Sequence, residues 1–93
     1  MVIGTAEIII FISETHSLKE KRSILHSLLK RLQNKFNAAI AEVDNQDMWQ
    51  KATIGAAVIG GTSAHADSQL QHIINMVESD PRVRVIDVET ELF

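Results

Sequence analysis

The sequence predicts a single α+β domain whose elements follow the order β-α-β-β-α-β, and three observations lead to this fold class. Two segments repeat apolar residues at helical spacing, four are rich in β-branched residues, and turn residues separate them. The 93 residues fit one domain spanning 1–93, and 45% hydrophobic with 23% charged residues is an ordinary globular balance. The absence of cysteine excludes disulfides, thiolate zinc sites and iron–sulfur clusters.

The first strand is expected at Val2–Ser13, where every even position is apolar or small. Glu7 and the lack of a basic leader indicate a strand here and not a signal peptide, so we expect a cytoplasmic protein without a membrane segment. Ser17-Leu-Lys-Glu20 is a capping box, in which serine and glutamate satisfy free N–H groups at a helix start. The first helix follows over about Leu18–Phe36, with a buried leucine stripe.

The second half is expected to supply two strands, a helix and a last strand, at Asn37–Val43, Lys51–Ile59, Ala64–Ser79 and Arg82–Phe93. Apolar residues of the last strand change parity along its length, and a β-bulge near Val85–Ile86 would reconcile them because one extra residue reverses the alternation. The order predicts a ferredoxin-like fold, with two helices on one face of a four-stranded antiparallel sheet. Right-handed crossovers place the first and third strands in its centre.

Two motifs resemble a known family. Ser-Leu-Lys-Glu-Lys-Arg at Ser17–Arg22 and Ala-Glu-Val-x-x-Gln-Asp-x-Trp-Gln-Lys-Ala at Ala41–Ala52 are similar to those of the bacterial YlxP-like family of uncharacterised small proteins, and the similarity extends along the whole chain. The resemblance implies a ferredoxin-like fold and gene neighbourhoods with translation-initiation and ribosome-maturation factors. It implies no established activity and no catalytic residues, so it links the chain to RNA or the ribosome by association alone.

Positive charge is concentrated in the first helix. The segment Ser17–Lys35 carries six of the nine Lys and Arg residues but one of the twelve Asp and Glu residues. A solvent-facing helix of this kind can bind nucleic-acid phosphates. The alternative is a solvated face balanced by the acidic remainder, and the net charge of −3 argues against indiscriminate nucleic-acid binding. The candidate phosphate contacts are Lys19, Lys21, Arg22, Lys30 and Arg31, of which Lys21 lies at the edge of the leucine stripe.

The sheet face that the helices leave uncovered is a second candidate surface. Ile3, Ile9 and Phe11 form an apolar patch there, which predicts a homodimer unless Trp49 and the C-terminus fold over it. Glu7 in the middle of this face and the absence of tyrosine argue against base stacking.

Trp49, in the turn between two strands, has two interpretations. With Gln46, Asp47 and Gln50 it can form a partner-binding anchor. It can also plug the end of the core, which we favour because the turn needs an apolar anchor.

No catalytic, metal or cofactor site is expected, because the four histidines do not assemble and no catalytic constellation is recognisable. The sequence therefore predicts a non-enzymatic binding protein, associated with RNA or a ribosomal particle through its basic first helix. The alternative is a regulatory or structural homodimer that senses a small molecule.

Overall fold

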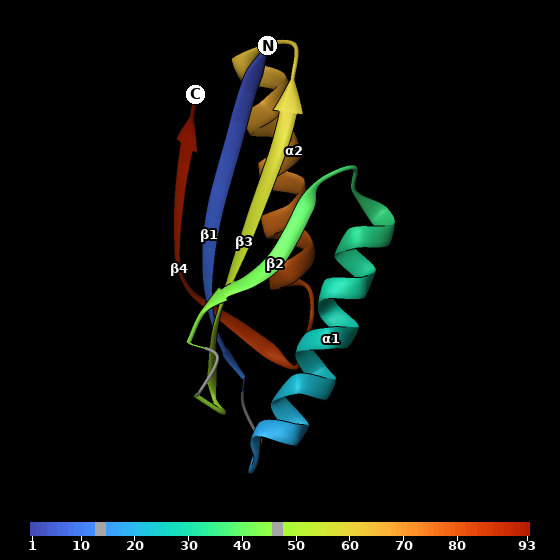
Figure 1. Ribbon diagram of the computed structural model, residues 1–93, viewed down its shortest axis with the longest axis vertical. Helices are drawn as coiled ribbons and strands as arrows, with labels where there is room; N and C mark the ends of the chain where they lie inside the picture. The colour runs from blue at the N-terminus through green and yellow to red at the C-terminus, as the bar shows by residue number, and fades with distance from the viewer. Residues whose placement is uncertain (13–14, 46–47) are drawn as a thin grey trace.

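The structure is a computed structural model that describes residues 1–12, 15–45 and 48–93 (Figure 1). Its elements are β1 (Val2–Ile12), α1 (Leu18–Lys35), β2 (Ala39–Asp44), β3 (Lys51–Gly60), α2 (Ser63–Glu78) and β4 (Val83–Leu92). Their order is the predicted one, and the predicted bounds differ by two residues or fewer. None of the helices in the described ranges is long and apolar enough to cross a membrane.

The strands form one antiparallel sheet in the order β2-β3-β1-β4, so β1 and β3 are central as predicted. In Figure 1, α2 lies behind β1 and β3, and α1 lies beside β2. The two helices pack against each other and on the same side of the sheet. Among the described residues, no helix covers the opposite side, which is called the open face below. This arrangement confirms the α+β, ferredoxin-like fold.

Successive side chains of β1 point alternately into the core and toward the open face. Ile8, Ile10 and Ile12 are fully buried beneath the helices, whereas Glu7 is exposed on the open face. Full burial of one such side chain contributes about 1.5–3 kcal/mol. The helices complete the core with residues at helical spacing, namely Leu25, Leu28 and Leu32 from α1 and Ala66, Leu70, Ile73, Ile74 and Val77 from α2.

The capping box predicted at the start of α1 is present with a small change. Ser17 Oγ accepts a hydrogen bond from the backbone N–H of Glu20 at 3.2 Å. The Glu20 carboxylate in turn accepts from the backbone N–H of His16 at 2.9 Å, one residue before the serine. One free N–H of the first turn and the N–H of the residue before the cap are therefore paired.

The predicted bulge in β4 is confirmed. Ile9 pairs with Asp87 while its neighbour Ile10 pairs with Val85, so Ile86 has no partner on β1. The extra residue reverses the alternation. As a result Val85 and Val88 both pack on the core, although their positions differ in parity.

Candidate binding surfaces

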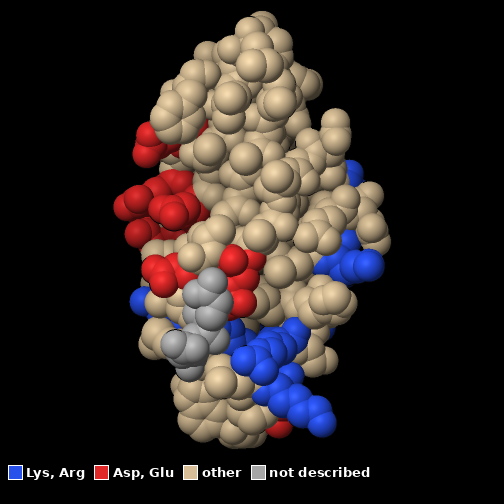
Figure 2. All heavy atoms as spheres, in the orientation of Figure 1, with Lys and Arg blue, Asp and Glu red and all other residues tan. Residues whose placement is uncertain are grey.

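A stripe of basic residues lies on the solvent side of α1. Lys19, Arg22 and Lys30 are exposed together with His26, and at 100° per residue the four fall within about 80° around the helix. They extend over about 16 Å of its axis. Figure 2 shows the basic side chains gathered on the α1 side of the molecule. The surface expected from the sequence is thus present for Lys19, Arg22 and Lys30.

Lys21 does not belong to that surface, which corrects its place among the predicted phosphate contacts. Its side chain is 1% exposed. Its ammonium donates to the backbone carbonyl of Asn45 at 2.7 Å and lies 3.1 Å from Glu42 Oε2. The aliphatic stem lies along the core. The ammonium is bound by Glu42 of β2 and by Asn45, the residue after β2, so it is not free to contact a phosphate. Lys21 therefore ties α1 to the β2–β3 connection.

Arg31 is only partly free. Its side chain is 49% exposed, and its guanidinium lies 3.3 Å from the carboxylate of Asp80, which follows α2. Substitution of Arg31 would therefore perturb the fold as well as any surface, contrary to the expectation that this side chain simply faces solvent.

Asp80 is the charged centre of the junction between α1, α2 and β4. Its carboxylate is fully buried and accepts from the backbone N–H, Nε and Nη2 of Arg82 at 2.9, 3.0 and 2.7 Å. These side-chain hydrogen bonds from Arg82 hold the pKa of Asp80 below its usual value, with help from the charge of Arg31. Arg82 Nη2 also reaches Ser27 Oγ of α1 at 3.4 Å.

The open face changes character along its length. It is apolar at one end, acidic in its middle and cationic at the other end, and Figure 2 shows the acidic side chains gathered toward β4. Glu7 lies directly opposite Glu89, a like-charged pair that is unfavourable in a sheet. The rows across β3, β1 and β4 are Ile59-Ile3-Phe93, Ala57-Thr5-Glu91, Gly55-Glu7-Glu89, Thr53-Ile9-Asp87 and Lys51-Phe11-Arg84.

The predicted dimer patch is only partly open. Ile3 is 37% exposed, and Ile9 is half-buried. Phe11 is half-buried as well, with the guanidinium of Arg84 lying 5.4 Å from its ring centre as a cation–π partner. The backbone of Phe93 pairs with Ile3 through two hydrogen bonds, so the C-terminus extends the sheet beside the patch.

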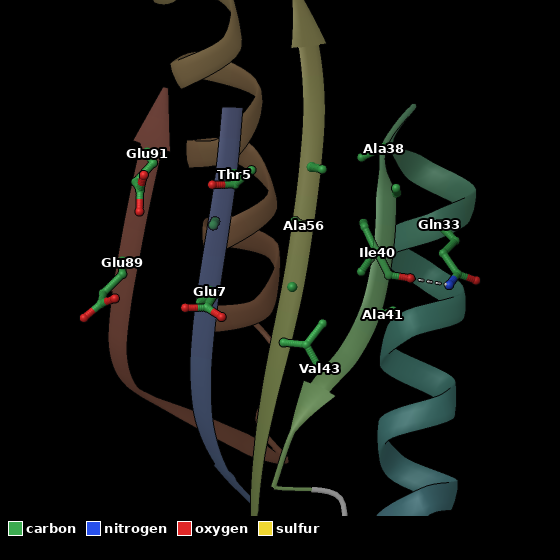
Figure 3. A pocket seen from close by; sticks show the side chains of 14 residues that line it. Thr5, Glu7, Gln33, Ala38, Ile40, Ala41, Val43, Ala56, Glu89 and Glu91 are labelled. Carbon is green, nitrogen blue, oxygen red and sulfur yellow. Dashed lines mark hydrogen bonds between the residues drawn. The ribbon is translucent and has the colours of Figure 1, made fainter. Parts of the chain in front are cut away.

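A hollow of about 800 Å³ lies on the open face (Figure 3). Gly55 and Ala57 of β3 and Ala39 and Ala41 of β2 line its floor, because their small side chains leave the space empty. Figure 3 shows Val43 on the β2 side and the glutamates of β1 and β4 on the other. A Cβ at Gly55 would lie 2.8 Å from a Val43 methyl, so glycine is needed for Val43 to cover this row.

Trp49 is not a buried plug, which corrects the favoured interpretation of this residue. Its side chain is 46% exposed. Its backbone is fixed, because the buried Thr15 hydroxyl donates to the Trp49 carbonyl at 2.7 Å and Gln50 pairs with Ile12. Thr15 and Lys21 close the core at this end in its place. Gln50 is exposed, and Gln46 and Asp47 lie outside the described residues.

Sequence reasoning did not identify the hollow or the Asp80 junction. Runs of small residues in β2 and β3 were the available signal for the hollow. Within residues 1–12, 15–45 and 48–93, no three His, Asp or Glu side chains lie close enough to hold a metal ion.

Comparison with known proteins gives a family match. Residues 3–90 match the family described as Protein of unknown function (DUF503). The chain is 37% identical over 92 residues to Uncharacterized protein YlxP of Bacillus subtilis (strain 168), covering 99% of this chain and 100% of that relative. A VAO-type flavoprotein of Myceliophthora thermophila, MtVAO615, aligns with 98% of this chain at a TM-score of 0.48 and 16% identity. The chain spans 16% of that flavoprotein, and this likeness carries no argument about function.

Proposed function

Because the chain belongs to the DUF503 family of proteins of unknown function, its role must be argued from its own surfaces, and we propose that it is a non-enzymatic protein that binds RNA phosphates along α1. The observation that carries the proposal is the exposed stripe of Lys19, Arg22 and Lys30. RNA is chosen among polyanions because the family resemblance implies a translation context.

The distribution of charge supports this use of α1. The acids of the open face, Glu7, Asp87, Glu89 and Glu91, lie on β1 and β4, whereas α1 flanks β2 at the opposite edge of the sheet. Glu42 of β2 is paired with Lys21. A phosphate chain lying along α1 would therefore meet cations without facing the acidic rows. The open face is less suited to bases, since Glu7 is exposed in its middle and Phe11 is stacked under Arg84.

Sedimentation of cell extract through gradients at two salt concentrations tests the proposal. Wild type should co-migrate with RNA or ribosomal particles at low salt and dissociate as salt rises, because bound cations release counterions from phosphates. The double variant Lys19→Gln, Lys30→Gln should lose most of this association and show a salt slope lower by up to about two units.

The matched control is Lys35→Gln, which removes one charge at an exposed α1 position outside the stripe and is compared with Lys19→Gln alone. Its association should stay close to wild type. Equal losses in these two single variants would indicate a net-charge effect and contradict a specific role of the stripe. Wild type that never co-migrates with RNA at low salt would also overturn the proposal.

The hollow supports the rival function, a dimer that senses a small molecule, because its volume lies in the range of ligand pockets. A metabolite that raises the melting temperature of purified protein, and loses this effect in Ala57→Trp, would favour the rival.

A further inference from the structure

The open face takes up a large part of the broad side of the molecule. The molecule measures 42 × 21 × 17 Å, so this broad side, sheet and α1 together, has an area on the order of 800 Å², comparable to one partner's share of a standard interface. Part of this face is apolar, because Ile59 at its upper end is 63% exposed and Phe93 is 68% exposed. Apolar groups of this size on one face of a small protein indicate a binding surface.

The rows of this face are complementary to themselves under one symmetry operation. A two-fold axis that lies in the face, runs across the strands and passes through the Thr53-Ile9-Asp87 row exchanges the rows on its two sides. The row of Glu7 and Glu89 then faces the partner's row of Phe11 and Arg84. On β4 the partner's Arg84 meets Glu89, and on β3 the partner's Lys51 meets Gly55, the neighbour of Glu7. The two copies of Asp87 face each other at the axis, so the charge complementarity comes from the rows on either side of it.

The same operation brings together a hollow and a large side chain. Trp49, two residues before β3, and Ala57 of β3 are each four residues from Thr53. The hydrogen bond between Ile12 and Gln50 continues the pairing of β1 with β3 to the residue next to Trp49. The partner's Trp49 therefore comes to the row of Ala57, on the floor of the hollow. An indole held at 46% exposure by a fixed backbone suits such an insertion.

We propose that a second copy of this chain covers the open face across this axis, with strands antiparallel, so that the partner's Trp49 fills the hollow and the partner's Arg84 neutralises Glu89. The uncompensated Glu7–Glu89 pair then has a physical role, because it receives cations from the partner. The charged rows on either side of the axis set the register of the two copies, and Ile9, Phe11 and Trp49 supply the burial.

Exchanging the charges of Arg84 and Glu89 tests the proposed dimer, with the molecular mass in solution as the measurement. Wild type should have twice the chain mass by light scattering at tens of micromolar (about 50 μM), within reach of an interface of this area. Arg84→Glu and Glu89→Arg, both at exposed positions, should each give monomers with unchanged circular dichroism. The combined variant should return to the dimer, since each copy then offers the opposite charge to its partner. Glu78→Arg on α2 is the control and should remain dimeric.

The sole tryptophan gives an independent readout. On dilution its emission maximum should move to longer wavelength at the concentrations where the mass halves, as the indole leaves the hollow. Ala57→Trp should give monomers, because the new indole fills the hollow that the partner's Trp49 would occupy. A monomeric wild type at every concentration overturns the proposal. So does a dimer that neither single charge reversal disrupts, or a double swap that stays monomeric.

Discussion

Asp80 should stabilise the fold through the charge of its carboxylate, and Asp80→Asn isolates that charge at nearly constant volume. The wild-type carboxylate accepts three hydrogen bonds from Arg82 and one from Arg31. Hydrogen bonds to charged groups contribute about 1.5–3 kcal/mol each when fully buried. Both guanidinium groups remain in contact with water, at 38% and 49% exposure, so they can rehydrate and the loss is smaller than the sum.

We therefore expect Asp80→Asn to lower the free energy of unfolding by about 2 kcal/mol, or roughly 8–16 °C in Tm for a domain of this size. Urea denaturation followed by circular dichroism measures the change, and the m-value should not move. Asp67→Asn, an exposed aspartate on α2, is the control and should stay within about 0.5 kcal/mol of wild type.

The stability that the Asp80 carboxylate contributes should depend on pH. The pKa of Asp80 is lower in the folded protein than its usual value, so its contribution is present above that usual value of about 4 and is lost as pH falls through the folded-state pKa. The difference between wild type and Asp80→Asn should accordingly be largest near neutral pH and should shrink below about pH 4. A difference under about 0.5 kcal/mol at neutral pH, or one that grows on acidification, would refute the reasoning.

Three further outcomes follow from the other sites. Lys21→Met should destabilise the fold by about 1–3 kcal/mol, because Glu42 loses its partner, and a second change to Glu42→Leu should recover part of the loss in denaturation experiments. Trp49→Ala, measured in dilute solution, should cost less than about 1.5 kcal/mol, well below the 3–5 kcal/mol of a buried aromatic. Ile9→Glu should convert the proposed dimer to monomer by light scattering with the helical circular dichroism intact, because Ile9 lies at the two-fold axis.

The elements of the fold could be predicted from local pattern, because each signal lay within a few residues of the feature that it predicted. The capping box at Ser17 marked the start of α1, and the change of parity around Ile86 located the bulge. Long-range partners were not predictable in this way. Arg31 and Asp80 are far apart in sequence and meet only because α1 packs near the end of α2.

On the candidate surfaces, too, some features follow from local sequence pattern and others depend on contacts between distant residues. The exposed positions of Lys19 and Lys30 follow from helical spacing alone. The exposure of Trp49 does not, because hydrophobicity suggested burial, and only the packed structure shows Thr15 and Lys21 closing that end of the core. The angular position of Lys21 on the leucine stripe was the one local signal of its burial.

The opposite placement of cations on α1 and acids toward β4 gives the molecule a permanent electric dipole across the sheet. With a net charge of −3 the molecule as a whole is repelled from a polyanion, and salt screens this repulsion at separations beyond about one Debye length. Closer in, the field of the polyanion exerts a torque on this dipole that turns α1 toward the negative surface. Encounters would then be slow but already oriented, so that salt influences both the frequency of approach and the angle at which contact is made.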